Sequence, residues 1–165
     1  LDDYNSIFKN MNKANYEQRE ECVKLLNNYP GFICKSIEEH HKKRKEINDT
    51  LGHDAGDIML KVIAQRFVQC ARNTDTVSRQ GGDEFTILMP RIKNREDAAI
   101  LAERILESNK ENIRINSKTV HPKTSIGISV FPDDGNTVAK LIKNADMAMY
   151  HAKERGKNQF CFYKF

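Results

Sequence analysis

The chain has 165 residues, of which 39% are hydrophobic and 30% charged, and its formal net charge is +4. This length fits one domain with a proper core, and the mild basic excess suits a polyphosphate ligand but not a protein that wraps nucleic acid. No apolar run approaches membrane-spanning length and no secretory leader is recognisable, so we expect no membrane contact within this segment. The first residue is Leu1, so we expect part of a longer protein, although a processed terminus would look the same.

The cysteines are scattered and form no Cys-x-x-Cys pair; they are Cys22, Cys34, Cys70 and Cys161. This pattern favours free thiols in a reducing cytosol over disulfides or a metal site. We therefore expect a cytoplasmic location.

The first third of the chain is polar apart from one short apolar run. Residues 4–28 are mostly helical in character, and Pro30 with Gly31 breaks that helix. Residues 32–37 are a candidate first strand. The very polar residues 38–48 predict an exposed helix or loop.

A helix and then a hairpin are predicted next. Residues 55–72 place apolar side chains at helical spacing, namely Ile58, Leu60, Val62, Ile63, Phe67 and Val68. Residues 75–78 and 86–89 are β-branched or apolar enough to predict two short strands. Between these strands lies Arg79-Gln80-Gly81-Gly82-Asp83-Glu84-Phe85, in which two glycines run directly into two acids.

This predicted hairpin tip carries the strongest chemical signal in the chain. Gly81 and Gly82 suit a tight turn because neither resists positive φ, and they leave the backbone bare to a bulky anion. Asp83 and Glu84 would repel that anion unless a divalent cation lay between them. The string therefore suggests a metal–phosphate site, with an ordinary solvated turn as the alternative.

The last third repeats the alternation of helices and strands. The predicted elements are a helix at 95–109, a pair of strands at 113–120 and 123–131 around His121-Pro122, a helix at 137–153 and a last strand at 159–163. Gly156 is expected to end the last helix. The pattern predicts an α/β (α+β) fold in which helices flank a mixed central sheet.

Five separated strings agree in order and spacing with one family; they are residues 47–57, 72–75, 79–85, 124–129 and 145–158. On these strings the chain resembles the GGDEF domain, the catalytic domain of bacterial diguanylate cyclases, over residues 47–163. The resemblance implies a fold like the palm of nucleotidyl cyclases and polymerases. It also implies one domain over 1–165, with 1–30 as a divergent N-terminal helical segment and 31–165 as the core.

The resemblance implies that two GTP molecules are joined into cyclic di-GMP, with release of pyrophosphate, where two such domains face each other as a homodimer. Because these domains usually follow sensory modules, the chain could also be the cytoplasmic part of a larger membrane-bound sensor. One alternative is an impaired domain that binds GTP or cyclic di-GMP as a regulatory module. A purely structural dimerisation domain is a third.

At the hairpin, the resemblance makes Asp83 a metal-binding acid, and often the proposed base for the ribose 3′-hydroxyl. Glu84 becomes a second metal ligand or an electrostatic helper. Mg²⁺ (or Mn²⁺) is the implied ion, since carboxylate and triphosphate oxygens meet its demand for hard ligands.

Three residues near the start of the predicted 55–72 helix match the family's substrate pocket. Asn48 and Asp57 resemble the residues that bind guanine in the family. A carboxylate can accept hydrogen bonds from both the N1–H and the exocyclic amine of guanine, a pair of donors that adenine lacks. A first-turn acid favoured by the helix dipole is the alternative for Asp57. His53 matches a further pocket position, with a local hydrogen bond as its alternative.

Lys153 and Lys157 match basic positions that contact the triphosphate in the family. Cations near a helix C-terminus are also favoured by the helix dipole, which is the simpler alternative. The family more often has arginine where Lys157 stands, and lysine keeps the charge but loses the bidentate fork.

Arg72 and Asp75 have the spacing of the family's product-binding inhibitory site, and Arg79 is grouped with them as a candidate allosteric residue. Arginine suits such a site because it can fork onto phosphate or guanine acceptors. The alternative is a surface ion pair of little energetic worth.

The match fails where the family carries Asp-x-Asp-x-Phe-Lys, whose first Asp is a metal ligand. Ungapped alignment places His40 at that Asp, and imidazole is a poor substitute for a hard oxygen ligand of Mg²⁺. Glu38 or Glu39 could supply a carboxylate if the strand slips by a residue or two. The resemblance therefore leaves one ligand of the metal site unmatched.

Overall fold

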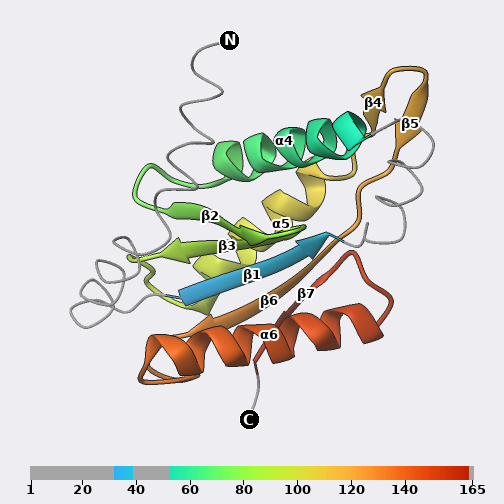
Figure 1. The fold of residues 1–165 in the computed structure, drawn as a ribbon. Helices are drawn as coiled ribbons and strands as arrows, with labels where there is room; N and C mark the ends of the chain where they lie inside the picture. The colour runs from blue at the N-terminus through green and yellow to red at the C-terminus, as the bar shows by residue number, and fades with distance from the viewer. Residues whose placement is uncertain (1–31, 39–52, 164–165) are drawn as a thin grey trace.

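A computed structural model describes residues 32–38 and 53–163, which form a central sheet covered by helices on both faces (Figure 1). The five strands of the sheet, in spatial order, are β2 (Thr76–Gly81), β3 (Glu84–Met89), β1 (Phe32–Glu38), β6 (Thr124–Val130) and β7 (Phe160–Phe162). The helices are α4 (His53–Cys70) and α5 (Arg95–Ser108) on one face and α6 (Val138–Glu154) on the other.

The sheet is mixed, as predicted. β1 lies at its centre and pairs antiparallel with both β3 and β6, whereas β7 pairs parallel with β6. The parallel pair is possible because α6 supplies the long crossover that parallel neighbours require. The fold class is therefore α+β, with helices flanking a mixed sheet.

The alternation of side chains along β3 separates the two cores. Phe85 and Ile87 are fully buried in the core formed with α4 and α5, and the ring of Phe85 meets Phe67 of α4 edge-on at 5.1 Å. Leu88 instead packs with Leu141 of α6 on the opposite face. This period of two fixes which face each hairpin residue occupies.

One glycine sets how closely α6 lies on the sheet. A Cβ on Gly127 of β6 would come within 2.0 Å of the Ala145 carbonyl oxygen and 2.3 Å of the Met149 nitrogen. Both neighbours are backbone atoms of α6 and cannot swing aside. Gly127 is therefore a contact point between helix and strand.

Most predicted elements appear within two residues of their expected ends, but the predicted pairing of 113–120 with 123–131 is wrong. The first segment folds back on itself as β4 (Ile113–Ile115) and β5 (Lys118–Val120), while β6 joins the main sheet. Asn116 adopts φ 54° in the turn between β4 and β5, a conformation that asparagine tolerates.

The apolar face of α4 also differs from the prediction. Ile58 and Val68 were expected to supply it, but they are 41% and 45% exposed. Leu60, Ile63 and Phe67 are buried, as predicted. The packed stripe runs through Met59, Ile63 and Phe67, all at most 1% exposed and spaced four residues apart.

Other predictions have mixed outcomes. Those for residues 4–28 and 39–48 lie outside the described part of the chain. Cys70 and Cys161 are free thiols, as predicted. No helix in the described ranges combines the length and apolar character needed to cross a bilayer.

Candidate functional site

The predicted hairpin is present, and its turn is Gly82-Asp83. β2 ends at Gly81 and β3 begins at Glu84, with a register shift between Arg79 and Gly81. Gly82 has φ 54°, a conformation open to glycine at little cost. The two acids therefore stand at the tip, Asp83 in the turn and Glu84 at the start of β3.

Arg79 braces this turn. Its Nε and a terminal guanidinium nitrogen both donate to the Gly82 carbonyl oxygen, at 2.9 and 2.6 Å. A planar guanidinium that donates twice to one oxygen holds the turn in one orientation. Arg79 thus contacts the acidic tip, and its grouping with Arg72 and Asp75 stays a prediction.

The two acids differ in exposure. Asp83 is 5% exposed, although it stands in a two-residue turn, and Glu84 is partly buried. A carboxylate this far from water requires hydrogen bonds or positive charge around it.

The end of β1 reaches the acidic tip. Ile37 pairs with Glu84, and Glu38, the last residue of the strand, pairs with Thr124 on the other side. Glu38 is therefore one register step from the strand pair that contains Glu84. Glu39 and His40 lie outside the described residues.

A complete metal site is not assembled within the part of the chain that the structure describes. No three His, Cys, Asp or Glu side chains gather closely enough to hold an ion among the side chains described, which lie within 55–163. The hard oxygen donors Asp83 and Glu84 nevertheless suit Mg²⁺, and the end of β1 is the place from which a third carboxylate would come.

Two of the residues predicted for the substrate pocket, His53 and Asp57, lie in the first turns of α4. His53 is its first residue, Asp57 is exposed one turn later, and Asn48 lies outside the described residues. The start of α4, the end of β1 and the hairpin tip all lie toward the same side of the molecule, on the right in Figure 1. The Asp57 side chain is exposed and so is accessible to a ligand.

The two candidate triphosphate lysines lie at the end of α6, on the same side of the molecule (Figure 1). Lys153 is half-buried in the last turn. Gly156 has φ 109° and ends the helix, as predicted, and Lys157 follows with φ 68°. The structure thus brings the lysines to the side that carries the acidic hairpin.

Arg72 and Asp75 lie at the other end of α4, in the turn that leads into β2 (Figure 1). The Asp75 carboxylate accepts a hydrogen bond from the Arg72 backbone N–H at 2.8 Å, and the Arg72 carbonyl accepts one from the Asp75 N–H at 2.9 Å. The Arg72 guanidinium lies instead 3.8 Å from Oδ1 of Asp97 in α5. The predicted alternative, an ion pair between Arg72 and Asp75, is therefore replaced by an ion pair with Asp97.

Sequence reasoning missed Asp97. Its one signal is its place three residues after Asn94, whose side chain accepts a hydrogen bond from the Asp97 N–H at 3.1 Å and caps α5. This capping pattern indicates a helix start but does not point to Arg72.

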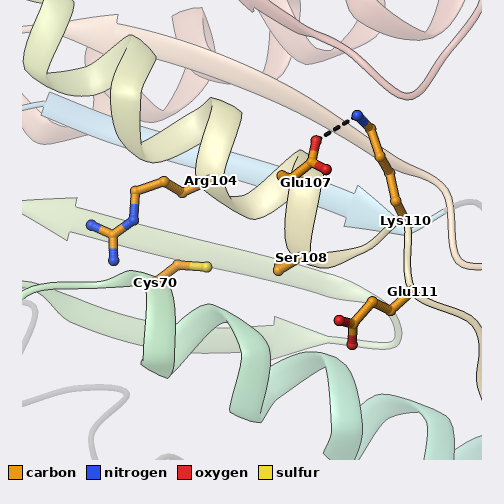
Figure 2. A pocket seen from close by; sticks show the side chains of 6 residues that line it. All are labelled: Cys70, Arg104, Glu107, Ser108, Lys110 and Glu111. Carbon is orange, nitrogen blue, oxygen red and sulfur yellow. Dashed lines mark ion pairs between the residues drawn. The ribbon is translucent and has the colours of Figure 1, made fainter.

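A cavity of about 460 Å³ lies between α4 and the C-terminal part of α5 (Figure 2). Its lining residues are Cys70, Arg104, Glu107, Ser108, Lys110 and Glu111. Glu107 and Lys110 form an ion pair at its rim. None of the described residues predicted for the site lines this cavity.

A mixed sheet with acids at a hairpin tip is the architecture of palm-like nucleotidyl cyclases. The family model described as the GGDEF domain of diguanylate cyclases matches residues 40–159. The chain belongs to the GGDEF family.

Relatives of known structure and sequence agree with this assignment. The chain is 43% identical over 122 residues to the bifunctional diguanylate cyclase/cyclic di-GMP phosphodiesterase MucR of Pseudomonas aeruginosa, covering 73% of this chain and 17% of MucR. It is 39% identical over 133 residues to the cyclic di-GMP phosphodiesterase NbdA of the same organism, covering 81% and 17%. The crystal structure of the GGDEF domain of P. aeruginosa TpbB superposes with a TM-score of 0.81 at 33% identity, covering 88% of this chain and 92% of that one.

The chain spans only about a sixth of the length of MucR and NbdA. The two names include synthesis and hydrolysis of cyclic di-GMP. Family membership therefore indicates cyclic di-GMP metabolism in general, and the reaction of this domain needs its own argument.

Proposed function

We propose that this domain is a diguanylate cyclase, which condenses two GTP molecules into cyclic di-GMP and pyrophosphate when two copies face each other as a dimer. The observation that carries the proposal is the braced Gly82-Asp83 turn, which sets two acids beside the end of β1. In each of the two condensations, the ribose 3′-oxygen of one nucleotide forms a bond to the α-phosphorus of the other. The bond between that α-phosphorus and the pyrophosphate leaving group breaks. Two facing domains present both nucleotides to each other, so no single copy suffices.

The proposal assigns the metal, Mg²⁺ or Mn²⁺, to Asp83 and Glu84, with Glu38 as the third carboxylate. When bound, the metal would neutralise charge on the phosphate oxygens. Glu38 is preferred over Glu39 and His40 because it ends β1, and continuing the register of the Ile37–Glu84 pair by one residue sets it opposite Asp83. Asp83 and Glu84 would hold the ion, and the bare backbone of Gly81 and Gly82 would let the triphosphate approach.

The nucleotide would lie along the side of the molecule that carries the hairpin tip. Asp57, with Asn48 and His53, would read guanine at the start of α4, and Lys153 and Lys157 would hold the phosphates from the end of α6. Most of the rate acceleration would come from positioning and charge neutralisation, as in other phosphoryl transfers.

Incubation of the purified chain with GTP and Mg²⁺, at high concentration and as a forced dimer, tests the proposal. Cyclic di-GMP and pyrophosphate are the expected products. Asp83→Asn should abolish turnover, whereas Asp133→Asn, an exposed acid in the loop after β6, should leave it unchanged. Unchanged turnover in Asp83→Asn would refute the role of that residue.

A second candidate is a regulatory module that binds GTP or cyclic di-GMP without turnover. It is favoured by His40 at the position of the family's first metal-binding Asp, and by the phosphodiesterase named among the relatives. Calorimetric binding of either nucleotide by a forced dimer that makes no product would establish this candidate over the cyclase.

The same proposal treats residues 1–165 as one domain of a longer, signal-responsive protein, located in the cytoplasm. Its arrangement would place a divergent segment, 1–30, ahead of a core that starts at residue 31. Limited proteolysis of the chain tests this division, with a stable fragment that begins near residue 31 as the expected product.

A further inference from the structure

We propose that Asp97 weakens the binding of an anionic dinucleotide at Arg72, and so sets the product concentration at which the domain is inhibited. This inference rests on the proposed function, because it takes cyclic di-GMP as the ligand of the Arg72–Asp75 segment. It concerns a residue outside that segment, on a different helix. Its basis is the geometry around the Arg72 guanidinium.

Arg72 is the cation that an anionic ligand would use. Its side chain is 48% exposed, in the turn between α4 and β2. Its backbone N–H is already bonded to the Asp75 carboxylate at 2.8 Å, which fixes the turn and leaves the guanidinium as the mobile part. That guanidinium is 3.8 Å from Oδ1 of Asp97.

Asp97 is held in place, so it acts as a fixed negative charge. Its Oδ2 accepts a hydrogen bond from the Lys93 backbone N–H at 2.9 Å, and its own N–H donates to the capping Asn94 at 3.1 Å. Its side chain is only 20% exposed. The carboxylate is therefore less free to move than Arg72 when a ligand arrives.

Two consequences follow for a phosphodiester ligand. The ligand must compete with Oδ1 of Asp97 for the guanidinium, and the same carboxylate repels phosphate oxygens a few ångströms away. Both effects lower the affinity. Because the Arg72 pair is long and half-exposed, the loss is modest, about twofold to fivefold, as expected for a surface ion pair.

The Asp97→Asn variant tests this inference. It removes the charge while its amide oxygen can still accept from the Lys93 N–H. Calorimetric titration of the full chain with cyclic di-GMP should give a dissociation constant about twofold to fivefold below that of the parent at low salt, and less at high salt. The gain should be smaller in an Arg72→Ala background, because the competition for the guanidinium is then absent and only the repulsion of the phosphate by Asp97 remains.

Glu96→Gln is the matched control, since it removes the same charge from an exposed neighbour in the same helical turn. It should change the affinity less than Asp97→Asn. Equal or weaker binding by Asp97→Asn, or no cyclic di-GMP binding by either parent or variant, would overturn the inference. If the parent chain makes no cyclic di-GMP from GTP, the proposed cyclase is overturned. The inference about Asp97 is still tested in that case, because the binding titration does not depend on turnover.

Discussion

A guanidinium nitrogen of Arg95 in α5 lies 2.6 Å from Oδ1 of Asp134 in the loop between β6 and α6, although Asp134 is only 6% exposed. The second oxygen of Asp134 accepts from the Val130 N–H at 2.8 Å, and its carbonyl accepts from the Asn144 side chain at 2.6 Å. The Arg95 guanidinium also lies 5.5 Å from the centre of the Phe162 ring in β7. Asp134 thus joins three elements: the start of α5 through Arg95, the end of β6 through Val130, and α6 through Asn144.

Asp134→Ala should lower the free energy of unfolding by about 2 kcal/mol, because it leaves the Val130 N–H and a partly buried guanidinium without their acceptor. The midpoint of urea unfolding measures this loss. Asp133→Ala is the matched control, since its carboxylate is exposed and 3.9 Å from the Arg95 Nε. It should cost less than about 0.5 kcal/mol. Equal losses in the two variants would show that Asp134 has no special part in the connection.

Gly127→Ala should lower the free energy of unfolding by more, about 3 kcal/mol or above. The new methyl group meets backbone atoms of α6, so the helix must move away from the sheet. Thermal and urea unfolding measure the change. Gly156→Ala separates this clash from backbone strain, since its φ is +109° but nothing lies within 4 Å of the added Cβ. For Gly156→Ala we expect the free energy of unfolding to fall by about 1 kcal/mol. A milder effect at Gly127 than at Gly156 would contradict the close approach of α6.

Arg79→Lys should lower cyclic di-GMP synthesis by about tenfold with little loss of stability. A single ammonium cannot reproduce the pair of hydrogen bonds from Arg79 to the Gly82 carbonyl oxygen that orients the acidic turn. Initial rates at saturating GTP, together with the melting temperature, separate the two effects. Arg114→Lys, an exposed change in β4, should alter neither quantity. A fall in melting temperature large enough to explain the lost rate would make Arg79 a stability residue instead.

These relationships differ in how far the sequence predicts them. The hairpin and the later helices follow from local patterns, because a Gly-Gly turn and apolar residues at helical spacing act over short distances. The pairing of β6 does not, since its partner β1 is some ninety residues earlier in the chain. The helical period alone also could not decide which face of α4 packs, and so Ile58 and Val68 were placed inward wrongly.

The candidate site shows the same limit. The acids at the tip and the lysines at the end of α6 come from local strings, and the structure places the hairpin tip and the end of α6 toward one side of the molecule. Asp97 could not be found this way, because its relation to Arg72 depends on how α4 and α5 pack. The proposed third metal ligand is similar, since ungapped alignment points to His40 while strand register points to Glu38.

The Glu38→Gln variant therefore distinguishes the ligand indicated by strand register, Glu38, from the one indicated by ungapped alignment, His40. We expect it to weaken Mn²⁺ binding in the presence of GTP by about tenfold or more, because an amide oxygen is a weaker ligand than a carboxylate for a hard cation. Titration of Mn²⁺ followed by electron paramagnetic resonance measures this directly and does not depend on turnover. His40→Ala should change the binding by less than about twofold, since the loss of a non-ligand side chain removes no donor. If His40→Ala weakens the binding and Glu38→Gln does not, the register argument fails, and the metal is held from two residues beyond the end of β1.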